Sequence, residues 1–388
     1  MKIALLKPTI VGEDRVAAIP ETCARLGKVG LEFIVQCGAG AAAGFPDADY
    51  EAAGARLVSD AAALYQEADA VVMVQAPAAE EIAQLQSGTL LFCIVNPLIQ
   101  HDLVRRLADQ GVHTLAMDMM PRISRAQKMD VLSSMSTVSG YKAVLLAAVE
   151  LGKMFPMMMT AAGTITPARV LVLGAGVAGL QAIATARRLG AVVEAFDVRP
   201  AVKEQVESLG AKFVEVEAPQ QDAEDAGGYA REMSEDYKKK QGEVVARHAA
   251  DSDVVITTAL IPGRPAPILI STETVHTMRG GSVIVDLAAE GGGNCALTRL
   301  GETVVENDVV IMGPNNLAAS APYHASQMFS RNVGAFVQEL TKEGRIELDL
   351  DNECVAGTLI TRDGEIVHER VRQAMGLEPL ATTQGSTA

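Results

Sequence analysis

Three glycines and one acid carry the clearest chemistry in this sequence. Gly174, Gly176 and Gly179 have the GxGxxG spacing, and Asp197 closes the next apolar run. Backbone amides in such a turn, together with the start of a helix, attract the phosphates of a dinucleotide. The acid accepts hydrogen bonds from a ribose hydroxyl, and it repels a 2′-phosphate at ~4 Å by ~4 kcal/mol at an effective dielectric of about 20. The pattern therefore predicts a site for NAD rather than NADP.

The apolar pattern shows which elements must position these residues. Residues 170–173 form a short apolar run typical of a buried parallel strand, and residues 177–189 have the pattern of a helix. A strand, a glycine turn, a helix and a second strand ending in an acid are more specific together than GxGxxG alone. The alternative is a glycine turn that only packs a helix against a strand. Arg199 lies on the same side of an extended chain as Asp197 and could partly offset the repulsion of a 2′-phosphate.

Length and composition favour two α/β domains. The chain has 388 residues, and ~150 residues per domain suggests two or three domains. Hydrophobic residues make up 49%, with no Trp and 34 Gly, which suits parallel sheets covered closely by helices. The formal net charge of −15 argues against nucleic acid or an anionic membrane surface as a partner.

Cysteine usage and hydropathy indicate a soluble intracellular protein. The five cysteines are scattered, odd in number and without CxxC spacing, so neither disulfides nor a metal site are expected. The N-terminus starts as a strand rather than a signal peptide. The most apolar stretch, residues 141–163, is interrupted by charged residues and a proline and does not reach the ~20 residues of a membrane helix.

A series of alternating strands and helices precedes the glycine turn, and a second series follows it. The first predicts a parallel-sheet domain of its own, with strands at 3–6, 31–35, 70–74, 90–95 and 112–117. Gly38, Gly40 and Gly44 follow one of these strands, but their GxGxxxG spacing is wrong for a dinucleotide turn. After a polar segment and a helix predicted at 137–155, the second series completes a six-stranded sheet with strands at 212–216, 253–257, 282–287 and 309–312.

The predicted fold class is therefore α/β, with two doubly wound parallel-sheet (Rossmann-like) domains, the second inserted into the first. Residues 1–136 and 322–388 would form the N-terminal α/β domain, and residues 137–321 the NAD-binding Rossmann domain. Helical periodicity resumes at Pro322 and continues to Leu340. Residues 376–388 are expected to be disordered.

Several longer motifs are unrelated to generic nucleotide binding. They closely resemble the NAD(H)-binding alpha-1 component of the proton-translocating NAD(P) transhydrogenase family, which is related to alanine dehydrogenase. The motifs are GEDRVAAIP at 12–20, MPRISRAQKMDVLSS at 120–134, MTAAG at 159–163, GGYA at 227–230, TTALIPGRPAP at 257–267 and VIVDLAAEGGGN at 283–294.

The resemblance implies a function and partners. It implies a cytoplasmic homodimer that binds NAD(H) and lies at the inner membrane through its partner subunits. One partner is an NADP(H)-binding beta subunit and another is a membrane-embedded subunit that translocates protons. Hydride would pass directly between the two nicotinamides, so no side chain need act as acid, base or nucleophile, and no metal is implied.

The resemblance also implies which residues form the site. Arg122, Gln127, Asp130 and Ser133 would position the nicotinamide, with backbone contacts from Ile123, Ser124 and Arg125. The alternative for this segment is a polar linker whose charges pair with one another. Tyr229 would belong to a mobile loop that folds over the nucleotide. The remaining expected cofactor contacts are Gly174, Gly176, Val177, Gly179, Asp197, Val198, Arg199, Gly228, Gln241 and Leu260.

Some positions leave alternatives open. Asp286 and Glu290 either cap a turn or contact the ligand, and the segment 314–327 departs from the family pattern. Alanine dehydrogenase shares the opening motif with Arg15, but it needs a lysine and a histidine where this chain has Gln75 and Asn96. A third possibility, a non-catalytic NAD-binding module, would also explain the glycine turn.

Overall fold

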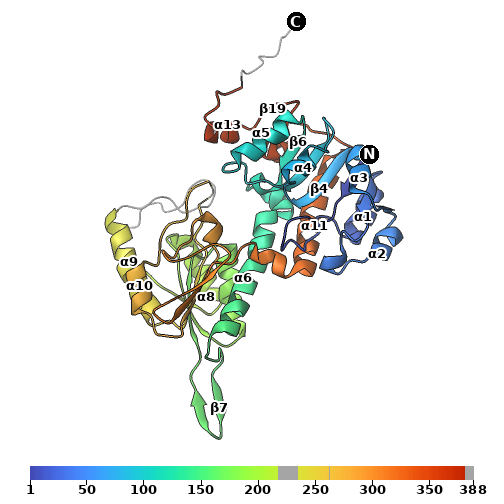
Figure 1. The fold of residues 1–388 in the computed structure, drawn as a ribbon. Coiled ribbons are helices and arrows are strands. Elements are labelled where there is room, and N and C mark those ends of the chain that lie inside the picture. The colour runs from blue at the N-terminus through green and yellow to red at the C-terminus, as the bar shows by residue number, and fades with distance from the viewer. Residues whose placement is uncertain (217–234, 262, 381–388) are drawn as a thin grey trace. The chain divides into compact units, whose positions relative to one another are not determined.

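The computed structural model describes residues 1–216, 235–261 and 263–380. The chain folds into two compact units, Met1–Met135 with Ala319–Ala388, and Ser136–Ala318. Both contain a sheet that is mostly parallel and covered by helices (Figure 1). The predicted fold class is thereby confirmed.

The first unit contains an eight-stranded sheet in the order β19-β18-β6-β5-β4-β1-β2-β3. Six strands are parallel: β1 (Lys2–Leu5), β2 (Glu32–Gln36), β3 (Arg56–Val58), β4 (Ala70–Gln75), β5 (Leu90–Ile94) and β6 (His113–Ala116). The C-terminal strands β18 (Leu359–Arg362) and β19 (Glu365–Ile366) add an antiparallel edge. Neither this edge nor β3 was predicted, because each strand is too short to give a clear apolar period.

Helices cover both faces of this first sheet. On one face, Leu64, Ile82 and Val104 pack into a cluster with Val71 and Leu91 of the central strands. On the other face, Phe336 packs edge-on against Phe92, with the ring centroids 6.0 Å apart. The helices are α1 (Pro20–Gly27), α2 (Asp47–Ala52), α3 (Ala61–Glu67), α4 (Ala79–Ile82), α5 (His101–Asp109), α11 (Pro322–Leu340), α12 (Glu353–Thr358) and α13 (Glu369–Ala374).

The second unit contains a seven-stranded sheet in the order β11-β10-β9-β12-β13-β15-β14. Six strands are parallel, as predicted: β9 (Arg169–Leu173), β10 (Val192–Phe196), β11 (Lys212–Phe213), β12 (Val254–Thr257), β13 (Val283–Asp286) and β15 (Val309–Met312). The predicted count of six was wrong, because β14 (Thr303–Glu306) forms an antiparallel hairpin with β15. Strand order reverses between β9 and β12, and in open sheets such a switch point is where ligands bind.

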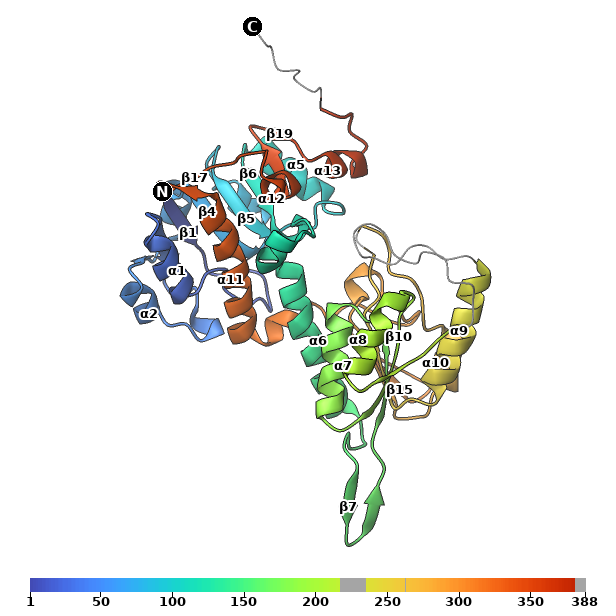
Figure 2. The same ribbon diagram turned by 180° about the vertical axis from the view of Figure 1, so that it is seen from behind.

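Helices lie on both faces of the second sheet. Figure 2 shows α7 (Val177–Arg188) and α8 (Lys203–Ser208) on one face and α9 (Glu235–Ala250) and α10 (Thr272–Thr277) on the other. The long helix α6 (Val131–Glu150) joins the first group, with Ala143, Val144 and Ala147 in the same cluster as Val170. A hairpin of β7 (Met158–Thr160) and β8 (Gly163–Ile165), which the sequence did not predict, extends from this unit.

Helix α6 begins earlier and ends earlier than the predicted range 137–155. It starts at Val131 because Asp130 caps it: the Ser133 backbone N–H donates to Asp130 Oδ1 over 2.9 Å. Among the described residues, α6 is the one helix long and apolar enough to span a membrane, a test that core helices also pass.

The second glycine turn, at Gly38, Gly40 and Gly44, is a packing feature. A Cβ atom on Gly40 would lie 2.7 Å from the Tyr50 hydroxyl and 2.7 Å from the Phe45 carbonyl oxygen. The Gly38 amide donates to the Asp47 carboxylate over 2.8 Å. Tyr50 and Asp47 therefore occupy the space and the amide that a phosphate would need.

Candidate functional site

Each glycine after β9 has its own structural reason. Gly174 has φ 98°, a conformation that favours glycine, and a Cβ atom there would lie 2.5 Å from Thr258 Oγ1. A Cβ atom on Gly179 would lie 1.8 Å from the Gly174 carbonyl oxygen, so helix and turn can approach only without it. Gly176 caps α7 without a side-chain hydrogen bond, and a Cβ atom there would meet no atom within 4 Å.

The space at Gly176 suits an anion. The first amides of an α-helix have no partner within the helix, and the helix dipole adds a partial positive charge there. Val177, the first residue of α7, has a side chain that is 43% exposed. The turn thus presents free backbone donors at the open end of the sheet, as a pyrophosphate requires.

Asp197 and Arg199 form a nearly buried ion pair at the end of β10. Asp197 Oδ2 accepts from the Ala175 amide over 2.7 Å, and Oδ1 accepts from the Arg199 amide and Nε, each over 2.9 Å. The side chain of Asp197 is only 6% exposed. The acid is therefore next to the glycine turn, as a ribose ligand requires, but its carboxylate already has a cationic partner. Val198 lies between the two paired residues.

Helix α9 contributes an aromatic residue that sequence reasoning missed. Burial, and after it the negative charge of Asp197, raises the pKa of Tyr237, so its phenol stays protonated at neutral pH. No sequence motif marks this position. Gln241, one turn later, is half-buried on the same helix. The predicted lid residues Gly228 and Tyr229 lie outside the described residues.

The loop after β12 borders the glycine turn. Thr258 Oγ1 donates to the Gly174 carbonyl oxygen over 3.1 Å, which ties the start of the loop to the turn. Leu260 follows two residues later and is 47% exposed. The structure therefore brings Leu260 close to the turn, whereas no contact of this kind joins Gln241 to it within the described part of the chain.

The predicted nicotinamide loop lies in the first unit. It contains a 3₁₀ turn at Ser124–Met129, and the side chains of Arg122, Ser124 and Gln127 are exposed while Ile123 is half-buried. Asp130 and Ser133 contact each other, since Ser133 Oγ donates to Asp130 Oδ2 over 2.6 Å. These two residues cap α6, a role that the sequence did not reveal.

The same loop is anchored by the C-terminal part of the unit. Arg125 Nη2 donates to Asn352 Oδ1 over 3.1 Å and lies 3.3 Å from a Glu353 oxygen. Asn332 Nδ2 of α11 donates to the Lys128 carbonyl oxygen over 2.9 Å. For Arg125, the alternative of a charge that pairs within the protein is therefore the one that the side chain adopts.

Asp286 and Glu290, whose roles the sequence left open, are separated in function. Asp286 is fully buried and accepts hydrogen bonds from the turn that follows β13, including the Ala288 amide over 2.9 Å. Glu290 is exposed and accepts from the Asn316 amide over 3.1 Å. Asp286 is thus a structural acid within the turn, and Glu290 holds the first residues of the divergent segment 314–327.

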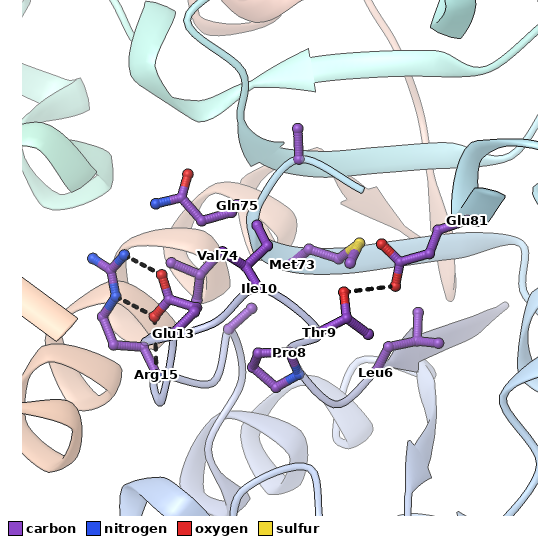
Figure 3. A pocket seen from close by; sticks show the side chains of 12 residues that line it. Leu6, Pro8, Thr9, Ile10, Glu13, Arg15, Met73, Val74, Gln75 and Glu81 are labelled. Carbon is purple, nitrogen blue, oxygen red and sulfur yellow. Dashed lines mark hydrogen bonds and ion pairs between the residues drawn. The ribbon is translucent and has the colours of Figure 1, made fainter. Parts of the chain in front are cut away.

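The first sheet has a switch point of its own, between β1 and β4, and a small cavity lies there (Figure 3). Arg15 Nε donates to Glu13 Oε1 over 2.7 Å, and both side chains are 2% exposed. The cavity measures about 20 Å³, enough for about one water molecule. Gln75 ends β4 beside this cavity, and Asn96, which follows β5, donates its amide to Asp118 over 2.9 Å.

Metal ligands are not gathered in the part of the chain that the structure describes: no group of three or more His, Cys, Asp or Glu residues could hold an ion. The five cysteines lie apart, and burial raises the pKa of Cys23 to about 12, which makes its thiol inert.

Comparisons with known proteins agree over nearly the whole chain. The family models for the N-terminal and C-terminal domains of alanine dehydrogenase/PNT match residues 6–139 and 143–369. The chain is 50% identical to the first of the separate polypeptides of NAD(P) transhydrogenase subunit alpha from Rhodospirillum rubrum, covering 95% of this chain and 98% of that protein. It is 31% identical to alanine dehydrogenase of Halomonas elongata, covering 97% and 98%. The solved transhydrogenase structure from Sinorhizobium meliloti superposes with a TM-score of 0.83 at 42% identity, covering 95% of this chain and 99% of that one.

Proposed function

The chain belongs to the alanine dehydrogenase/PNT family, and we propose that it is the NAD(H)-binding component of a proton-translocating transhydrogenase. In this proposal, hydride passes directly between NAD(H) bound here and NADP(H) bound to a partner subunit. The transfer is coupled to proton movement in a membrane-embedded partner. The chain would act as a homodimer, and it would reach the inner membrane only through these subunits.

One combination supports this function over its alternatives. A dinucleotide turn with open amides and a strand-end acid is present, while Gln75 and Asn96 occupy the places where alanine dehydrogenase needs Lys and His. An amide side chain cannot take up or release a proton near neutral pH, so oxidation of an amino acid would lack its proton relay. Transfer of hydride between two nicotinamides needs no such relay.

The residues of this chain would bind and orient the cofactor, which supplies the hydride chemistry when bound. Gly174, Gly176 and the first amides of α7 would hold the pyrophosphate. Asp197 would accept the ribose hydroxyls, in exchange for part of its contact with Arg199. Leu260 would pack against the adenosine side.

Residues at the nicotinamide end would hold the ring. Arg122 offers a fixed fork of donors for a phosphate, and Gln127 can both donate to and accept from a carboxamide. Asp130 and Ser133, by capping α6, would keep this loop at a fixed place on the helix. Orientation of this kind contributes to rate because hydride transfer demands that the two rings be held close and aligned.

Hydride transfer in a reconstituted system tests the proposal. Purified chain is mixed with the NADP(H)-binding domain of a transhydrogenase, and reduction of an NAD analogue by NADPH is followed. We expect turnover that requires both proteins. Tight NADH binding without turnover would contradict the proposal and leave a non-catalytic NAD-binding module. Oxidation of alanine with NAD by the chain alone would favour alanine dehydrogenase, in which case Arg15 would be its carboxylate ligand.

A further inference from the structure

The buried carboxylate of Asp286 organises the turn that follows β13. Its Oδ2 accepts from the Asn294 amide over 2.7 Å, the Cys295 amide over 3.0 Å and Thr298 Oγ1 over 2.6 Å. Its Oδ1 accepts from Thr257 Oγ1 of β12 over 2.8 Å. A carboxylate buried this completely is stable only when its lone pairs are taken up, and here the donors come from both ends of one turn.

Asn294, which the turn presents, is itself fully buried and contacts the loop after β12. Its Oδ1 accepts from the Ala259 amide over 2.9 Å. Its Nδ2 donates to the Ala259 carbonyl oxygen over 2.9 Å and to the Pro267 carbonyl oxygen over 2.8 Å. One amide side chain therefore fixes both ends of the loop 259–267, which contains no helix or strand in its described residues.

This loop has a second attachment to the turn. The Ala266 amide donates to the Gly291 carbonyl oxygen over 2.8 Å. A Cβ atom on Gly291 would lie 2.9 Å from Leu260 Cδ2, so Leu260 lies directly over this glycine. The place of Leu260 is thus set by contacts with the Asp286 turn.

From these contacts we propose that Asn294, held by Asp286, is a positioning residue for the dinucleotide site: it fixes the loop 259–267 so that Leu260 faces the nucleotide. The proposal rests on the proposed function, because it requires that NADH bind at the glycine turn. Ala259 follows Thr258, whose hydroxyl contacts Gly174 and would meet a Cβ atom on Gly179 at 3.3 Å. Movement at Asn294 would therefore be felt at the turn itself.

The test measures NADH affinity of the purified full chain by nucleotide fluorescence, well below its unfolding temperature. We expect Asn294→Ala to weaken NADH binding about tenfold, since three hydrogen bonds to the loop are lost. Asn294→Asp keeps the acceptor for the Ala259 amide but presents oxygen to two carbonyl groups, so it should not restore affinity. Leu260→Ala should weaken binding as well, and the double variant should lose less than the product of the single losses.

A control separates positioning from stability. Ile311→Ala removes a fully buried side chain from β15, which has no hydrogen bond to the described residues of the loop, so it should lower the unfolding temperature but change NADH affinity by less than about twofold. If Asn294→Ala does not fold, Thr298→Val removes one donor to Asp286 and should weaken NADH binding about threefold.

Affinity close to wild type in folded Asn294→Ala would overturn the proposal, as would losses that multiply in the double variant with Leu260→Ala. Because the measurement is affinity, wild-type chain that binds NADH but transfers no hydride would contradict only the proposed function.

Discussion

The carboxylate of Asp197 has to serve two partners. It accepts hydrogen bonds from Arg199 Nε over 2.9 Å and Nη2 over 3.0 Å. A ribose hydroxyl can be accepted only where the guanidinium gives up part of this contact. Arg199 therefore reduces the gain from binding NADH, and it also compensates a charge that would otherwise be buried without a partner.

Removal of this carboxylate should weaken NADH binding. A hydrogen bond between a hydroxyl and a charged acceptor contributes ~1.5–3 kcal/mol, so Asp197→Ala should lower affinity by a corresponding factor. The measurement is equilibrium titration with NADH, with Asp197→Asn as a control that keeps the side-chain size. If affinity did not change, the ribose would lie elsewhere.

At the scale of elements, His368 links pH to the stability of the C-terminal part of the first unit. It precedes α13 as its N-cap residue, and its buried Nδ1 has no hydrogen-bond partner among the described residues. Burial, together with the positive charge of Arg370, lowers the pKa of His368 below its usual 6.5. The unfolded chain therefore takes up this proton more readily than the folded chain. The stability that the neutral ring contributes is present above pH 6.5 and is lost as pH falls through the lowered pKa.

His368→Gln should remove this part of the pH dependence. Thermal unfolding measured at neutral pH and at about pH 5 should show a smaller difference for the variant than for wild type. An unchanged difference would mean that other groups account for the acid sensitivity of the protein.

Prediction from sequence succeeded for elements with a long or strong apolar pattern and failed for short ones. The helix at 322–340 was predicted with the bounds of α11, since Pro322 starts it and its periodicity continues for 19 residues. By contrast, β14 and the β7–β8 hairpin consist of strands of three or four residues, mostly exposed, so no burial pattern marked them.

The candidate site could be predicted only in part, because spacing reveals backbone roles better than side-chain partners. The glycine turn was recognisable, since a GxGxxG pattern is a statement about backbone conformation. The ion pair of Asp197 with Arg199, the contact of Asn332 with the loop at Lys128, and the network around Asp286 depend on side-chain contacts. These contacts join residues up to 204 positions apart, and a single sequence does not reveal such pairs.

At the scale of the molecule, two sheets of related topology carry different chemistry. In both, the first six strands have the order 3-2-1-4-5-6, counted within each parallel set, and both have a switch point beside the first strand. In the second unit a glycine turn with open amides follows that strand. In the first unit the corresponding segment contains the buried pair of Glu13 and Arg15 and a cavity of about 20 Å³. Shared topology therefore does not imply two nucleotide sites; the residues at each switch point decide.

Helix α6 decides how the whole chain should distribute between membrane and solution. By length and hydropathy it passes as a membrane span, although only 39% of its apolar window is buried. Yet a Cβ atom on Gly140 would lie 2.1 Å from the Ala178 carbonyl oxygen, so α6 packs closely on α7. A helix held by this contact cannot also be surrounded by lipid. The net charge of −15 further opposes binding to an anionic membrane.

We therefore expect the chain, expressed without partner subunits, to stay in the supernatant after ultracentrifugation of lysed cells. Expressed together with the membrane subunits of a transhydrogenase, it should move to the membrane fraction and be released by an alkaline wash, because its attachment would rest on protein contacts. A Gly140→Leu variant, which pushes α6 away from α7, should lose solubility instead. Sedimentation of the wild-type chain by itself, with resistance to the wash, would mean that α6 enters the bilayer.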